Sequence, residues 1–133
     1  MKRIMGERTR TSLWVFGAYA FIMGLVLLLV PERVLPVFGF TEVSGSWVDV
    51  LGFVLCCSAY YYIQAGLSGI EGFARLTVHT RVIAPVVLLV LLAAGKVDHM
   101  VLLFGIGDAL GGVWTGIAIW MDRNGSERNT PPA

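Results

Sequence analysis

The sequence predicts an all-α integral membrane protein, a bundle of four transmembrane helices with both termini on the cytoplasmic side. Charged residues make up 14% of the 133 residues, whereas a soluble domain carries about 25%. The mean hydropathy is +0.76. Four windows stay apolar over about 20 residues, the length that a helix needs to cross the hydrocarbon core. Lys and Arg gather on one side of these windows, which sets their orientation.

The predicted spans cover residues 11–30, 46–68, 72–95 and 99–121. Backbone groups cannot stay unpaired in lipid, so each span should be helical. The many short alternating strands of a membrane barrel are absent from the sequence. The first span begins beside basic residues, as a signal peptide does. Its apolar stretch, 13–30, is longer than a signal core of about 7–15 residues, so we expect the helix to be retained.

The connection between the first two spans is too apolar for a free loop. Pro31 ends the first helix, and Val34, Leu35, Val37 and Phe38 follow it. We expect a short amphipathic segment that lies on the outer membrane surface. At the other end of the chain, residues 124–133 are polar and contain two prolines. This composition predicts a disordered cytoplasmic tail after a single transmembrane domain, 1–123.

The distribution of basic residues predicts the orientation. Eight Lys and Arg residues lie on the side of the termini and two on the other. Without Arg81, which falls inside a span, the ratio is seven to two. Because the side richer in Lys and Arg faces the cytoplasm, we expect a multi-pass protein of the plasma (inner) membrane with both termini cytoplasmic. The eight are Lys2, Arg3, Arg8, Arg10, Arg75, Arg81, Arg123 and Arg128, and the two are Arg33 and Lys96.

Several classes of site find no support in the sequence. The net charge is +1 and no basic platform with aromatic residues appears, so we expect no nucleic-acid partner. Cys56 and Cys57 are adjacent, without zinc or disulfide spacing. We therefore predict no metal, no cofactor and no catalytic residue. The expected partners are membrane lipids, with a second copy of the chain or another membrane protein left open.

Small residues predict where the helices pack, because close backbone approach drives association in lipid. The fourth span carries Gly105, Gly107, Gly111, Gly112 and Gly116, which contain two small-x-x-x-small pairs. Gly17 and Gly24 share a face of the first span, and Gly52 and Cys56 begin a similar stripe on the second. We expect these stripes to pack within the bundle. The alternative is that one stripe faces outward and forms a dimer.

One polar cluster is predicted inside the membrane. Asp108 lies about 15 Å from the outer end of its span, where a carboxylate costs about 2.5–3.5 kcal/mol on insertion scales. It should therefore face the interior, on the same side of its helix as Thr115. Arg81 is the expected partner, at a depth that differs by about 6 Å, and a guanidinium can pair with a carboxylate through two hydrogen bonds. His79 is an alternative partner.

The second span adds a polar stripe that includes Tyr60 and Gln64. We expect Tyr60 to point inward with its hydroxyl near the cluster. The candidate binding residues are thus Asp108, Arg81, His79, Tyr60, Gln64 and Thr115. Two interpretations stay open: the cluster fixes which helices meet, or it lines a small pocket, since ionisable residues inside a membrane are candidate sites by default.

Four segments carry a family resemblance: Pro31 to Phe40, the tyrosines late in the second span, Thr77 to Arg81, and Gly107-Asp108 with Trp114-Thr115. With these segments the chain resembles small bacterial four-helix membrane proteins, the DoxX-like and related uncharacterised families. The resemblance implies the same four-helix topology in a bacterial inner membrane. It supplies no activity and no catalytic residue.

The sequence is compatible with three functions. The first is a non-enzymatic accessory or lipid- and ligand-binding bundle with a buried Asp–Arg cluster. The second is a small oligomeric transporter or channel that uses Asp108 and His79. The third is a membrane enzyme that acts on a lipid or quinone through Asp108, His79 and Tyr60, which requires an apolar cavity of roughly 300 Å³ or more at Asp108.

Overall fold

The computed structural model describes residues 5–41 and 46–128, and these residues are organised as helices without strands. The long helices are α1 (Glu7–Leu29), α3 (Ser46–Ser68), α4 (Glu71–Ala93) and α5 (Leu102–Arg128). A four-residue helix, α2 (Pro31–Val34), and a 3₁₀ turn, η1 (Leu35–Phe38), connect α1 towards α3. A second 3₁₀ turn, η2 (His99–Val101), leads into α5.

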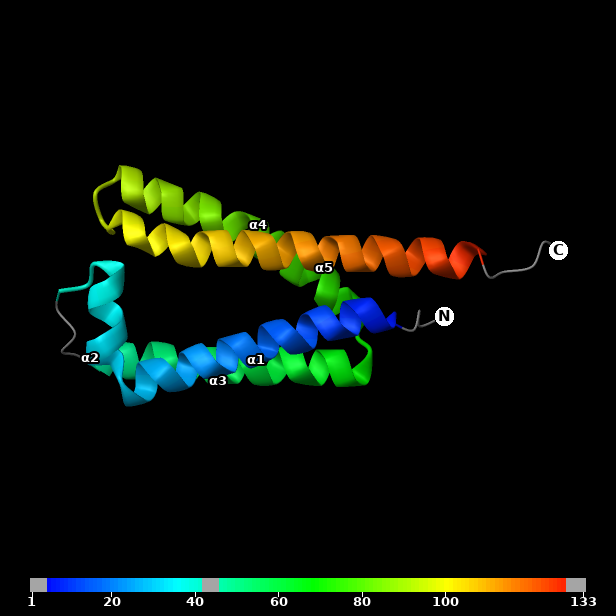
Figure 1. Cartoon of the computed structure of the whole chain (residues 1–133), viewed down its shortest axis with the longest axis horizontal. Coiled ribbons are helices and arrows are strands. Elements are labelled where there is room, and N and C mark those ends of the chain that lie inside the picture. The colour runs from blue at the N-terminus through cyan, green and yellow to red at the C-terminus, as the bar shows by residue number, and fades with distance from the viewer. Residues whose placement is uncertain (1–4, 42–45, 129–133) are drawn as a thin grey trace.

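The long helices form two pairs rather than a closed ring. α1 packs along α3, and α4 packs along α5. The pairs meet where the chain termini lie, mainly through α1 and α5, and they splay apart towards the opposite end (Figure 1). We call these the terminal end and the loop end. The segment α2–η1 lies at the loop end, in the opening between the pairs.

The predicted helices are confirmed. All four long helical segments are long and apolar enough to cross a membrane. The second span matches α3 at both ends, and α1 ends at Leu29, just before Pro31. The disordered tail is wrong for residues 124–128, because α5 continues to Arg128. A helix that is already nucleated gains a hydrogen bond with each added residue, so it can extend into polar sequence. Residues 129–133 lie outside the described residues.

Glycines set the close approach of α1 to α3. A Cβ atom added at Gly24 would lie 2.7 Å from the Cys56 Sγ and 2.8 Å from the Gly52 carbonyl oxygen. A Cβ at Gly52 would lie 3.0 Å from the Gly24 carbonyl oxygen. The two backbones are therefore in contact across this interface, as expected for small residues. On α5, Gly105 and Gly112 lie in the same way against α4. These stripes pack within the bundle.

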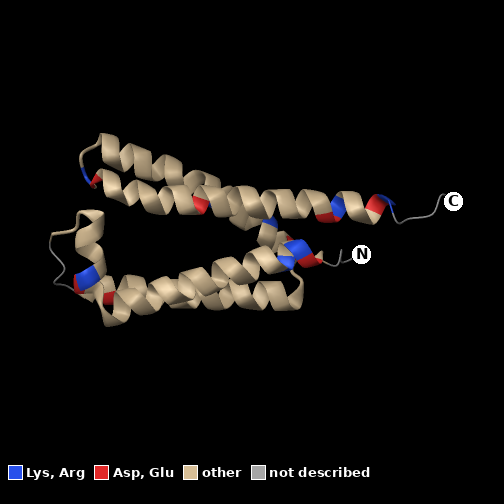
Figure 2. Cartoon of the chain, in the orientation of Figure 1, with Lys and Arg blue, Asp and Glu red and all other residues tan. Residues whose placement is uncertain are grey.

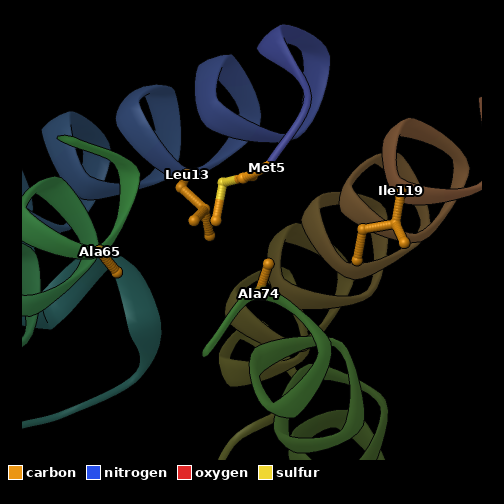
Figure 3. Close-up of a cluster of buried hydrophobic side chains, with 5 residues drawn as sticks. All are labelled: Met5, Leu13, Ala65, Ala74 and Ile119. Carbon is orange, nitrogen blue, oxygen red and sulfur yellow. The ribbon is translucent and has the colours of Figure 1, made fainter. Parts of the chain in front are cut away.

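The terminal end is closed by an apolar cluster to which α1, α3, α4 and α5 all contribute. Its buried members point towards one another in Figure 3 and are Met5, Leu13, Ala65, Ala74 and Ile119. Hydrogen bonds reinforce it. The Thr9 backbone N–H and hydroxyl donate to the same Asp122 carboxylate oxygen, at 3.0 and 2.7 Å. The Arg10 Nε donates to the Gly66 carbonyl at 3.0 Å. This end holds the two pairs together.

The α2–η1 segment contacts both pairs at the loop end. Leu35 is buried against Leu27 of α1 and Val48 of α3. The Phe38 ring stacks on Phe104 of α5, with centroids 4.2 Å apart. Gly39 ends η1 with a φ of +80°, the left-handed conformation that favours glycine. The predicted short segment is thus helical, and residues 42–45 lie outside the described residues.

Candidate functional site

A cavity of about 440 Å³ lies between the two helix pairs, and we call it the central cavity. All four long helices contribute to its wall, which is mostly apolar. Its volume falls in the range of about 300–1,000 Å³ that ligand pockets occupy. The residues that line it are Phe16, Tyr19, Ala20, Met23, Leu27, Leu51, Leu55, Ser58, Tyr62, Thr80, Arg81, Ala84, Phe104 and Asp108.

Arg81 is the only charged side chain among those described that is buried, with 3% of its surface exposed. Its Nη1 donates to the Thr115 hydroxyl at 3.1 Å. Its Nε and Nη2 are buried and have no hydrogen-bond partner. The guanidinium carbon lies 3.5 Å from the centre of the Phe16 ring and 5.1 Å from that of Tyr62. Aromatic faces, rather than an anion, therefore surround the cation.

The glycine face of α5 makes room for this arginine. A Cβ atom at Gly112 would lie 3.1 Å from the Arg81 Cβ, and one at Gly111 would lie 3.1 Å from the Arg81 Nη1. The Gly111 carbonyl also accepts a hydrogen bond from the Thr115 hydroxyl at 2.9 Å. Thr115 thus links the arginine to the α5 backbone, and larger residues at either glycine would displace the guanidinium.

The predicted ion pair between Asp108 and Arg81 is absent. Among the described residues, no salt bridge within 4.0 Å involves either side chain. Arg81 instead bonds to Thr115, which is seven residues further along α5, about 10 Å in axial distance. Asp108 is half-buried and lines the same cavity, within electrostatic range of Arg81. The two opposite charges therefore share a cavity without direct contact.

The other sequence candidates lie elsewhere. Tyr60, Gln64 and His79 are exposed and do not line the central cavity. The prediction that Tyr60 points inward is wrong, since 59% of its surface is exposed. Tyr62 takes the inward position, because two residues along a helix turn by about 200°. The structure thus places Arg81 in contact with Thr115 and in the same cavity as Asp108, and it leaves out the other three candidates.

The sequence-based prediction missed Phe16 and Tyr62, whose rings lie over the guanidinium. A usable pattern was present on α1. Phe16, Ala20, Met23 and Leu27 follow one another at intervals of four, three and four residues, the spacing of one helix face. From Leu13 to Leu29, however, all faces of that helix are apolar, so the pattern did not separate this face from the others.

A second cavity of about 380 Å³ lies between α1 and the α2–η1 segment. It shares Tyr19 and Met23 with the central cavity and is lined by apolar side chains and Arg33. The two cavities are thus neighbours along α1, on the way to the loop end. Within the described part of the chain, no three His, Cys, Asp or Glu side chains gather as a metal site requires.

No family model, no curated protein and no solved structure matches this chain. The resemblance to DoxX-like proteins therefore stays a prediction.

Proposed function

We propose that this chain is a multi-pass protein of the plasma membrane that binds a lipid-like ligand in the central cavity and catalyses no reaction. The central cavity carries the proposal: an apolar space between two helix pairs, with a buried arginine whose donors are not all used. Ligand sites are typically apolar cavities with a few placed polar groups.

The surface of the helices supports a membrane location. Only 11–33% of the residues in each apolar window are buried inside the protein. Large apolar side chains such as Phe53, Leu89 and Leu110 are more than half exposed, and soluble monomers rarely expose apolar surface on this scale. Charged residues gather towards the ends of the helices, which leaves their long middle sections almost free of charge (Figure 2). Lipid is the solvent that suits such a surface.

The basic residues support the orientation. Arg8, Arg10, Arg75 and Arg123 belong to the terminal end, whereas Arg33 and Lys96 belong to the loop end. Under the positive-inside rule the terminal end faces the cytoplasm. The test is labelling of single-cysteine variants in intact cells with a membrane-impermeant maleimide, after Cys56 and Cys57 are replaced by serine. Lys96→Cys should be labelled and Arg128→Cys protected; the reverse pattern would contradict the orientation.

The helix arrangement also suggests how a ligand enters. α1 and α5 contact each other, whereas α3 and α4 barely touch beyond their short connection. Both α3 and α4 nevertheless contribute side chains to the cavity wall, including Ser58 and Ala84. We therefore place the entrance between α3 and α4, which in a bilayer would open sideways to lipid.

The alternatives find less support in this geometry. The cavity is large enough for a lipid or quinone substrate and it touches Asp108. The enzyme and transporter hypotheses both need His79 beside Asp108, however, and the enzyme hypothesis also needs Tyr60. Both side chains are exposed and outside the cavity. Ligand binding requires neither of them.

The test uses a pair of substitutions on α4. Ala84 lines the cavity and is partly buried, whereas Ala93 is exposed and lies outside the cavity wall. Native mass spectrometry of the detergent-purified protein should detect a copurified ligand in the unchanged chain and in Ala93→Trp, but not in Ala84→Trp. Circular dichroism checks that both variants fold. Equal ligand content in the two folded variants would place the ligand outside the cavity and refute the proposal.

A further inference from the structure

We propose that the ligand of the central cavity has a zwitterionic head group, with an anionic phosphate that Arg81 binds and an ammonium group that Asp108 binds. This inference deepens the proposed function and rests on it. The ligand class is that of an aminophospholipid, with its acyl chain on the apolar part of the cavity wall.

The Arg81 side chain supplies the site for the anion. Its Nη1 is bonded to Thr115, which leaves Nε and Nη2 as the unused donors. These two nitrogens lie on one edge of the planar guanidinium, the edge that binds a phosphate or carboxylate through two parallel hydrogen bonds. The ring of Phe16 lies over the guanidinium carbon, with its centre 3.5 Å away, and a ring in that position accepts no hydrogen bond from the two N–H groups of this edge. A buried charged donor without an acceptor is costly, so an anion that fills this position gains affinity.

Asp108 supplies the site for the cation. Its carboxylate lines the same cavity, and no described residue donates a hydrogen bond to it or forms an ion pair with it within 4.0 Å. A simple anion would be attracted by Arg81 and repelled by Asp108. An uncharged head group would leave both charges unpaired. A molecule with both charges complements the two sites and keeps the cavity electrically neutral.

The rest of the wall suits an acyl chain. Met23, Leu27, Leu51 and Leu55 line the part of the cavity that runs towards the loop end, since α1 ends there and α3 begins there. The Nε and Nη2 atoms are buried. A head group therefore reaches them only when a neighbouring side chain moves, and the nearest rings are those of Phe16 and Tyr62, which both line the cavity.

Three single-chain lipids with the same acyl chain test the head-group preference: lysophosphatidylethanolamine, lysophosphatidylglycerol and monoacylglycerol. Their binding to the full-length, detergent-purified protein is measured by titration with native mass spectrometry. We expect the ethanolamine lipid to bind about tenfold more tightly than the glycerol-headed phospholipid, the ratio that one charge-assisted contact gives. Equal affinity of the two phospholipids would overturn the inference.

Substitutions assign the two charges separately. Asp108→Asn should lower the affinity for the ethanolamine lipid to that of the glycerol-headed phospholipid. Arg81→Met should weaken both phospholipids and leave monoacylglycerol unchanged. His79→Gln, an exposed position on α4, is the matched control and should change none of the three. If Arg81→Met folds and still binds both phospholipids as tightly as the unchanged protein, the assignment of the phosphate to Arg81 is refuted.

The outcomes also separate this inference from the proposed function. If all three lipids bind with equal affinity and Ala84→Trp prevents their binding, the cavity binds lipids but does not distinguish their head groups. In that case only the inference about the zwitterionic head group fails. If Ala84→Trp folds and excludes none of the lipids that bind the unchanged protein, the proposed function fails as well.

Discussion

Replacing Arg81 with methionine should leave the stability of the protein nearly unchanged. The variant loses the hydrogen bond to Thr115, worth about 1.5–3 kcal/mol for a charged donor, and the contact with the Phe16 ring, worth about 2 kcal/mol when desolvated. It also removes two buried donors without partners, each of which costs about 1–3 kcal/mol. Thr115 keeps its hydrogen bond to Gly111. The gains and losses cancel to within about 2 kcal/mol.

A buried ion pair would behave differently, because removing one partner costs about 3–5 kcal/mol. The free energy of unfolding is measured by titration with SDS from mixed micelles, followed by circular dichroism. A double-mutant cycle with Asp108→Asn then gives the coupling between the two side chains. We expect a coupling below about 1 kcal/mol, because the side chains do not touch. A loss above about 3 kcal/mol in Arg81→Met, together with a strong coupling, would refute this reasoning.

Three further substitutions probe the packing by the same unfolding measurement. Asp122→Ala should cost about 2–4 kcal/mol, because it removes two hydrogen bonds to the start of α1, whereas the exposed Glu127→Ala should stay within about 0.5 kcal/mol. Gly24→Leu should cost about 2 kcal/mol or more, since even a Cβ atom added at this glycine would clash with α3. Gly72→Ala, where a Cβ would meet open space, should be tolerated. Gly39→Ala should cost about 1–2 kcal/mol, because this residue has a positive φ. An unchanged unfolding midpoint for Asp122→Ala, Gly24→Leu or Gly39→Ala would contradict the structure described for that residue.

The helices themselves were predictable because the determinants are local. A run of about 20 apolar residues is helical wherever lipid or a protein core surrounds it, and α3 matches its predicted range of 46–68 at both ends. The end of α5 was not predicted well, because polar residues just beyond a span are compatible with either a tail or a helix. The extension to Arg128 follows from the helix that precedes it.

The candidate site was predicted only in part. Asp108, Arg81 and Thr115 were identified because ionisable or polar residues are rare within an apolar span. The contacts between them were not predicted correctly. The expected Asp108–Arg81 pair is absent, and Arg81 bonds to Thr115 and lies against the ring of Phe16. The depth of Arg81 in its span does not determine which polar group on α5 its long side chain contacts. Asp108 and Thr115 are about two helical turns apart, and the choice between them depends on how α4 and α5 cross.

The sequence by itself determined the number of long helices, their approximate ends apart from the C-terminal end of α5, and the glycine positions at which their backbones come close. Tertiary structure decided that the helices associate as two splayed pairs, and that Tyr62 rather than Tyr60 faces the interior. The physical reason is that outward-facing and core-facing residues are both apolar in the long helices of this chain. Hydrophobic periodicity then carries little information about which face is inside, and only the contacts between helices decide it.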